Sequence, residues 1–233
     1  MSKTLTTIAA ATLMATSGMA AAEVTFSGNV ALTSDYVFRG YSQADEDPAI
    51  QGGFDLEHSS GFYAGVWGSN VDFNDGDEAH IEVDLYAGFS GEFSNKLGYD
   101  VGVIHYDYPG ADGDLEYDFN EIYGSLSYDF GPAAATVGLA YSSDFFGNTL
   151  DDGTYVYVGV DVPLPNDFTL GLHYGTTDVD GESGQDDFEY DDWKLGLGKS
   201  YGGFDFALDY IDTDVDNDTL ADDRFVFTIS KSL

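Results

Sequence analysis

The sequence predicts an all-β protein: a closed, up-and-down, antiparallel transmembrane β-barrel of about 12 strands, with 10 or 14 strands as the alternatives. Three observations favour this fold. Segments of alternating polar and apolar residues recur along the chain. Six long connecting segments and five short turns follow one another in strict alternation between these strands, and aromatic residues gather at the strand ends. The long segments hold 28 of the 43 acidic residues, so most carboxylates are expected in water rather than on the strand walls.

Residues 1–22 have the features of a secretory signal peptide. Lys3 supplies the positive start, a weakly apolar run from Leu5 to Ala15 follows, and small residues end at Ala22. We expect cleavage between Ala22 and Glu23, which makes residues 23–233 the barrel domain. Nothing after residue 22 approaches the roughly 20 apolar residues that a membrane-spanning helix needs.

Twelve segments alternate with the two-residue period of a strand. The first is expected over residues 24–38, where Val24, Phe26 and Val30 share one face and Thr25 and Ser27 the other. The remaining strands are expected at 49–57, 61–71, 80–90, 97–107, 119–128, 133–141, 154–162, 167–175, 192–200, 203–210 and 224–230. One face is usually polar or Gly, and the other carries Leu, Val and Phe.

The connections distinguish a barrel from a water-soluble β-sandwich, which shows the same period. Five connections are short and rich in Gly and Pro, as tight turns are; they fall near residues 58–61, 92–96, 131–132, 163–166 and 201–203. The six long ones are 40–49, 72–80, 108–118, 142–153, 176–192 and 212–223. Strict alternation places every long loop on one rim and every short, periplasmic turn on the other. Greek-key sandwiches have no reason to keep that order.

Aromatic residues support the membrane assignment. Many of the 17 Tyr lie at the long-loop ends of strands, such as Tyr36, Tyr106 and Tyr141, and others, such as Tyr99 and Tyr128, lie near the short turns. Two rims of amphipathic rings are typical of membrane barrels. For any single Tyr, a general preference of aromatic residues for strands explains the position equally well.

The composition excludes several classes. A formal charge of −36 with seven Lys and Arg leaves no basic footprint for nucleic acid. There is no Cys, so disulfides, thiolate metal sites and a lipid-anchored N-terminus are excluded. No cofactor is predicted.

Three stretches carry a family resemblance: SDYVFRGYSQ at 34–43, PAIQGGFDLEHSSGFYAGVWGSNVDF at 48–73 and YDVGVIHYDYPG at 99–110. They resemble the TorF-type porin family of conserved bacterial proteins of unknown function, in detail over the first half and in pattern over the second. The resemblance implies a barrel in the outer membrane of a Gram-negative cell and brings no catalytic residues. One departure concerns the C-terminus, where outer-membrane barrels usually end in Phe or Trp. Here Phe225, Phe227 and Ile229 keep the alternation read by the barrel-assembly machinery, but Lys231 and Leu233 weaken that signal.

If the apolar faces meet lipid, the polar faces line a lumen. This places ten acidic residues inside: Asp35, Asp55, Glu57, Glu82, Asp84, Asp100, Glu121, Asp161, Asp205 and Asp209. Three basic residues are expected with them: Arg39, Lys194 and Arg224. Either these bases pair with lumen carboxylates, because unpaired charges in a narrow interior are costly, or Arg opposes an acidic wall in an electrostatic constriction.

Metal and enzyme interpretations have weaker support. Asp212, Asp214, Asp216 and Asp218 are spaced like the start of an EF-hand loop, but Asn217 replaces the required Gly and Asp223 the expected Glu. This is a weak calcium candidate, and no metal site is assigned. His105 falls on the apolar face and Ser125 on the polar face, so no nucleophile–base pair is apparent. Acidic pairs such as Glu82 and Asp84 are expected by chance in so acidic a chain. We therefore predict that the protein is not an enzyme.

The predicted function is an outer-membrane porin or channel for passive passage of small solutes. Cations should be favoured because Asp and Glu in a lumen attract them. The predicted partners are outer-membrane lipid, lipopolysaccharide, small solutes and the barrel-assembly machinery. The alternatives are a non-conducting structural or adhesive barrel that presents acidic surface loops, a barrel enzyme and a soluble periplasmic binding protein. Twelve strands fall between a filled and an open barrel, so the opening should be small or plugged by loops.

Overall fold

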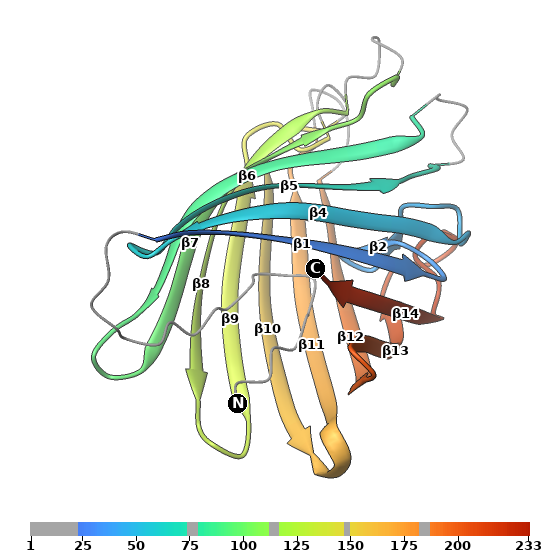
Figure 1. Cartoon of the computed structure of the whole chain (residues 1–233). Coiled ribbons are helices and arrows are strands. Elements are labelled where there is room, and N and C mark those ends of the chain that lie inside the picture. Colours follow the sequence, from blue (N-terminus) through green and yellow to red (C-terminus); the bar gives the residue numbers. More distant parts are fainter. Residues whose placement is uncertain (1–22, 74–78, 112–116, 147–149, 182–186) are drawn as a thin grey trace.

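The computed structural model describes residues 23–73, 79–111, 117–146, 150–181 and 187–233. The predicted signal peptide and Ala22 of its cleavage site lie outside the described residues. Twelve strands form one closed antiparallel barrel (Figure 1). They are β1 (Val24–Thr33), β4 (Ala49–His58), β5 (Phe62–Asn70), β6 (Ile81–Glu92), β7 (Leu97–Asp107), β8 (Phe119–Asp129), β9 (Ala134–Ser142), β10 (Gly153–Leu164), β11 (Phe168–Val179), β12 (Phe188–Tyr201), β13 (Phe204–Thr213) and β14 (Arg224–Ser232).

The strand order confirms the predicted up-and-down barrel of twelve strands. Each barrel strand pairs with its neighbours in the chain, and β1 pairs with β14 to close the ring, with Asn29 opposite Ser232 and Thr33 opposite Thr228. Such closure leaves no edge strand exposed. None of the helices in the described residues is long and apolar enough to cross a membrane.

The apolar faces of the strands point outward. Phe26 is 75% exposed, and Ile50, Phe54, Ile122 and Phe225 are exposed in the same way. A water-soluble sandwich would have buried these side chains between two sheets. An exterior of Leu, Val, Ile and Phe around a closed barrel is the surface that a membrane-spanning barrel presents to lipid.

Left-handed backbone forms two of the short turns. Asn166 and Asp167, in the 3-10 turn η2 (Pro165–Asp167), both have positive φ, and so do Gly202 and Gly203. Two consecutive residues of positive φ match the twist of the flanking strands, which is why Asn, Asp and Gly are favoured there.

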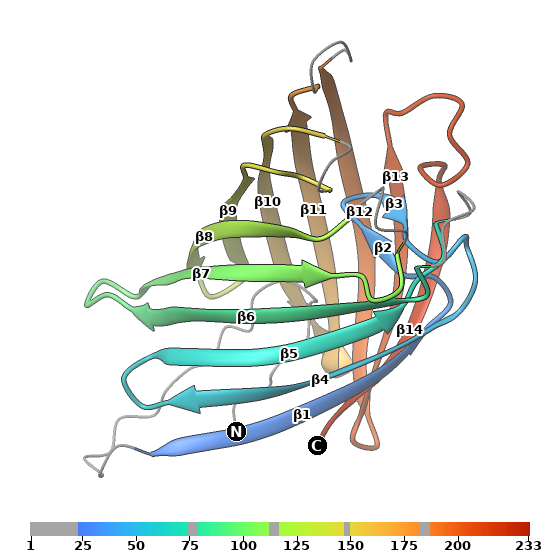
Figure 2. The same ribbon diagram turned by 90° about the horizontal axis from the view of Figure 1, so that it is seen from above.

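The first strand is shorter than predicted, and this is the main correction to the strand assignments. The alternation predicted a strand over 24–38, but β1 ends at Thr33, whose hydroxyl donates to the carbonyl of Asp35 at 2.8 Å. The chain then turns inward and forms a small hairpin from β2 (Val37–Phe38) and β3 (Tyr41–Ser42). Figure 2 shows this hairpin on the inner side of the barrel, near β12 and β13.

β11 and β12 are longer than predicted, because much of the expected loop at 176–192 is strand. Cross-strand polar contacts sustain the extension: the Thr176 hydroxyl donates to Asp191 at 2.7 Å, and these two residues lie opposite each other. Polar pairs of this kind hold strands together above the apolar belt, where water replaces lipid.

Candidate lumen constriction

The turn between β2 and β3 is formed by Arg39, with φ 47°, and Gly40, with φ 86°. Gly40 is required there for a second reason. A Cβ at this position would collide with the Thr213 methyl group of β13 and lie 3.0 Å from the Cβ of Asp192 on β12. The tip of the hairpin is therefore pressed directly against the barrel wall.

Arg39 extends from this tip to the opposite side of the lumen. Its hairpin leaves the wall between β1 and β4, and the strand order places β9 and β10 on the far side of the ring. The guanidinium donates to both carboxylate oxygens of Glu121 on β8, at 2.6 and 2.8 Å, and lies 4.4 Å from the ring centroid of Tyr155 on β10. The hairpin thus crosses the barrel interior rather than lying along one wall.

The ion pair between Arg39 and Glu121 is enclosed, with the two side chains 7% and 2% exposed. The Tyr106 hydroxyl also donates to Glu121 at 3.0 Å, and the Phe38 ring covers the guanidinium at 4.6 Å. Burial lowers the pKa of Arg39, whereas Glu121 raises it, and the net direction is upward. The guanidinium therefore keeps its charge inside the barrel.

A second ion pair fixes the base of the hairpin. Arg224 of β14 donates to Asp35 at 2.9 Å, and the Ser42 hydroxyl donates to the other Asp35 oxygen at 2.7 Å. Nearby, the Tyr36 hydroxyl donates to Glu82 of β6 at 2.7 Å. Both ends of the hairpin are thus held by carboxylates, one in the loop itself and the others on the strand walls.

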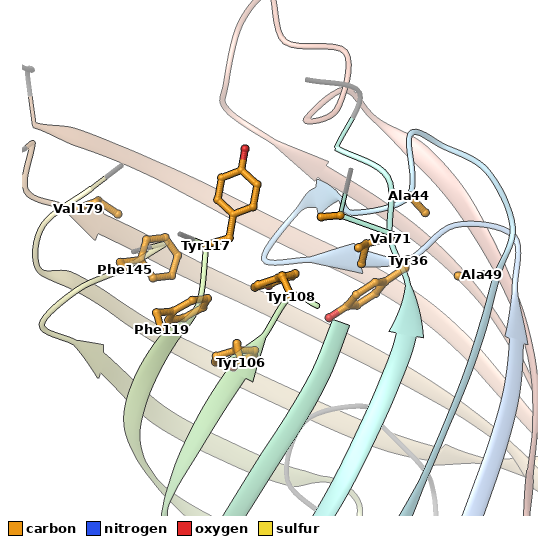
Figure 3. Close-up of a cluster of buried hydrophobic side chains, with 11 residues drawn as sticks. Tyr36, Ala44, Ala49, Val71, Tyr106, Tyr108, Tyr117, Phe119, Phe145 and Val179 are labelled. Atoms are coloured by element: carbon orange, nitrogen blue, oxygen red, sulfur yellow. The ribbon is translucent and has the colours of Figure 1, made fainter. Parts of the chain in front are cut away.

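An aromatic cluster fills the lumen around the hairpin toward the long-loop rim. Figure 3 shows Tyr106, Phe119 and Phe145 gathered on the inner side, with Tyr108 and Tyr36 beside them. The Tyr106 and Phe119 rings stack at 4.3 Å, and Phe119 and Phe145 meet edge to face at 5.1 Å. Aromatic pairs in these geometries stabilise beyond their buried area, so this half of the lumen resembles a protein core.

The half of the lumen toward the short turns is polar. The Tyr63 hydroxyl donates to Asp100 at 2.5 Å and lies 2.6 Å from the Tyr123 hydroxyl, and Tyr86 donates to Asp55. Tyr rings lie across Gly residues of neighbouring strands, as Tyr86 lies over Gly65. A two-layered interior follows: tyrosines and carboxylates on one side of the hairpin and packed aromatic rings on the other.

The residues predicted for the lumen occupy several levels of this interior. Asp35, Glu82, Asp84, Asp100 and Glu121 are buried. Asp55, Glu57, Asp161, Asp205, Asp209 and Lys194 are half-buried, on the strand face opposite the exposed apolar side chains. Asp205 lies near the short-turn rim, where the Ser200 hydroxyl donates to it at 2.5 Å. Of the predicted lumen bases, Arg224 pairs with Asp35 at the seam of β1 and β14, whereas Arg39 reaches Glu121 on β8.

Some of the four aspartates of the calcium candidate accept backbone amides. Asp214 accepts the Asp191 amide at 2.8 Å, and Asp218 accepts the Leu220 amide at 3.0 Å. The described part of the chain contains no group of three or more His, Asp or Glu residues placed to hold a metal ion. The loop stays a weak calcium candidate, with no metal site assigned.

Sequence reasoning did not identify the aromatic cluster or the partners of the hairpin. The adjacent Arg39 and Gly40 carried a signal for a tight turn, since Gly favours positive φ. Nothing in the sequence pairs this turn with Glu121, which lies 82 residues away.

The comparisons with known proteins place this barrel among proteins of similar architecture. The family model described as "Bacterial protein of unknown function (Gcw_chp)" matches residues 17–233. This match does not test the TorF name, which stays a prediction. No curated protein sequence matches the chain.

Solved structures give the clearest similarity. A structure titled "KdgM porin in complex with disordered oligogalacturonate" has a TM-score of 0.59 at 8% identity, covering 89% of this chain and 99% of that chain. The NanC porin has a TM-score of 0.57 at 10% identity, covering 88% and 98%. OccK5 (OpdH) of Pseudomonas aeruginosa has a TM-score of 0.50 at 14% identity, covering 90% and 67%. At these identities the similarity establishes a porin-like fold.

Proposed function

The chain belongs to the Gcw_chp family of bacterial proteins of unknown function, and from this premise we propose that it is an outer-membrane porin for small solutes. The observation that carries the proposal is the polar, tyrosine- and carboxylate-lined interior, enclosed by a closed barrel with an apolar exterior. A lumen of this kind offers water-borne solutes a path across lipid. We also propose that residues 1–22 direct export and are removed before Glu23.

The proposed channel prefers cations. Two of the three inward basic residues, Arg39 and Arg224, are neutralised by Glu121 and Asp35. Lys194 is the remaining predicted lumen base, whereas the eight other predicted lumen acids all lie on the strand walls. Rings of carboxylates raise the local concentration of cations and repel anions. The KdgM structure contains oligogalacturonate, a polyanion that so acidic a lumen would repel, so we do not transfer that solute to this chain.

The hairpin of β2 and β3 forms the constriction in this proposal. It crosses the lumen at the boundary between the polar layer and the aromatic layer, and Arg39 holds its tip to the far wall. Only small solutes would pass while it is docked. Passage through the aromatic layer requires the hairpin or the long loops to move, so we expect brief, small openings rather than a steady large current.

Planar bilayers containing the purified protein test this function. We expect small single-channel currents in potassium chloride and, in a salt gradient, a reversal potential of the sign for cation selectivity. Replacing the inward acids Asp55 and Asp100 with Asn should reduce that potential. Asp129→Asn, at a short turn where the carboxylate accepts the Gly131 amide, is the matched control. Anion selectivity in the wild-type protein would remove the proposed preference.

A non-conducting barrel that presents acidic loops is the second candidate. The aromatic cluster favours it, because the buried rings of Tyr106, Phe119 and Phe145 occupy the lumen near the long-loop rim. The two candidates differ in one experiment. If residues 37–42 are replaced by a Gly-Ser linker and neither this variant nor the wild type conducts, the structural role is favoured.

A further inference from the structure

The acidic wall beneath the hairpin contains one carboxylate that differs from its neighbours. Glu82 and Asp84 project from the same inward face of β6, and Glu121 lies on β8. Tyr36 donates to Glu82, and Tyr106 and Arg39 donate to Glu121. The Oδ1 atom of Asp84 is fully buried and has no hydrogen-bond donor among the described residues.

This position makes an unsatisfied carboxylate oxygen costly. The Asp84 residue is 6% exposed and its neighbour Glu82 is 1% exposed. A buried charge is tolerated when it is paired and hydrogen-bonded, and Arg39 is already paired with Glu121, whose two carboxylate oxygens both accept from its Nη2 atom. Asp84 therefore needs either a proton or a cation from outside the chain.

The surroundings of Asp84 supply the contacts that an ammonium group uses. Trp67 of β5 and Tyr106 of β7 lie directly opposite Asp84 on its two flanking strands. Their rings are on the inner side, and the Trp67 ring meets the Tyr36 ring edge to face at 5.4 Å. Aromatic faces next to a carboxylate attract a cation through the ring quadrupole as well as through charge.

A second unsatisfied acceptor lies on the same wall. Gln51 of β4 is buried, and its Oε1 atom has no donor in the described part of the chain. Its amide nitrogen donates to Ser69 of β5 at 3.4 Å, and Ser69 lies opposite Glu82. Gln51 is thus a second buried acceptor on this wall, separated from Asp84 by β5.

We propose that Asp84 is the centre of a lumen subsite for an ammonium group, with Trp67 and Tyr106 beside the cation. The inference rests on the proposed function for its route, because the cation reaches this wall along the lumen. The subsite is a position, directly below the hairpin, at which the permeating cation binds. The cations that it accepts are ammonium and small primary amines.

The experiment measures binding rather than current, so it is independent of conduction. The chain has two Trp residues, and Trp193→Phe leaves Trp67 as the single fluorescent reporter opposite Asp84. Methylammonium chloride is titrated into this protein in detergent at constant ionic strength set with sodium chloride. We expect a saturable change in Trp67 fluorescence. Asp84→Asn should weaken the apparent affinity at least tenfold.

The matched control is Asp205→Asn, which removes an inward carboxylate at the short-turn rim and should leave the titration unchanged. Asp84→Glu, which keeps the charge, should retain saturable binding and guards against a folding defect in Asp84→Asn. An equal response in Asp84→Asn, or no saturable response in the wild type, would overturn the subsite. A fluorescence change that follows pH alone and is insensitive to methylammonium would mean that Asp84 holds a proton instead. If binding occurs without current, the subsite stands and the channel proposal fails.

Discussion

Removing the charge of Arg39 tests whether one ion pair keeps the hairpin across the lumen. Arg39→Met retains a long side chain among the rings of Phe38 and Tyr155 but leaves the Glu121 carboxylate, 2% exposed, without its cation. Breaking a buried ion pair by removing one partner costs about 3–5 kcal/mol. Since about 1.4 kcal/mol corresponds to tenfold in an equilibrium constant, the ratio of docked to released hairpin should fall by roughly 10²- to 4 × 10³-fold.

The barrel itself should survive this change. Arg39 is in a turn, and its loss removes no strand hydrogen bond of the twelve-stranded ring. The cost of breaking the ion pair therefore reduces the stability of the docked hairpin and not that of the barrel wall. We expect Arg39→Met to show larger or more frequent single-channel openings and to keep the heat-dependent gel mobility of a folded barrel.

A double variant checks the physical reason. Arg39→Met with Glu121→Gln removes both charges and keeps an acceptor for the Tyr106 hydroxyl. Replacing both members of a buried pair costs much less than removing one, so the double variant should return toward wild-type currents. As a control, Lys194→Met also removes one positive charge, but from the strand wall rather than from the hairpin. Wild-type currents in Arg39→Met, with the barrel folded, would refute the reasoning.

Three further predictions follow from named contacts. Gly40→Val should prevent docking by collision with β12 and β13 and raise the single-channel current, whereas Gly131→Ala, with positive φ but open space around it, should leave the current unchanged. Leu85→Arg places a charge on the lipid-facing surface and should destabilise the barrel in urea titrations in lipid vesicles by about 2–4 kcal/mol; the inward substitution Ser125→Arg should cost less. Tyr63→Phe removes a half-buried hydroxyl that donates to a carboxylate of β7, so it should lower the free energy of unfolding by about 1 kcal/mol. An unchanged free energy of unfolding would contradict this prediction.

The barrel could be predicted from the sequence because its signals are local. The two-residue period gives the wall, and Gly, Pro and Asn mark the turns. Phe26 and Phe225 fall on the face that the alternation predicts for lipid, and both are largely exposed. An even number of up-and-down strands also leaves the first and last strands antiparallel to each other, as their pairing in the closed ring requires.

The end of the first strand could not be predicted in the same way. Tyr36 and Phe38 continue the alternation of Val30 and Leu32, but these two aromatic residues pack against the interior cluster rather than lipid. The sequence pattern is the same whether an apolar side chain contacts lipid or packs inside the barrel. The sequence pattern therefore extended a strand through the point where the chain leaves the wall.

The partners across the lumen depend on tertiary arrangement. The ion pairs Arg39–Glu121 and Arg224–Asp35 join residues 82 and 189 positions apart, and their formation needs both the closed ring and the inward turn of the hairpin. The polar extension of β11 and β12 could not be predicted from the sequence for a different reason. Thr and Asp are typical of loops, and only their cross-strand contacts identify them as strand.

The seam between the first and last strands has a consequence for the order of assembly. β14 contacts β1 only from Asn29 to Thr33 in the paired register, and the seam continues where the Ser34 amide donates to Phe227 and the Ser34 hydroxyl accepts from it. Arg224 can reach Asp35 only after β14 has arrived. The ion pair at the base of the hairpin therefore forms only when the C-terminal strand closes the ring against β1.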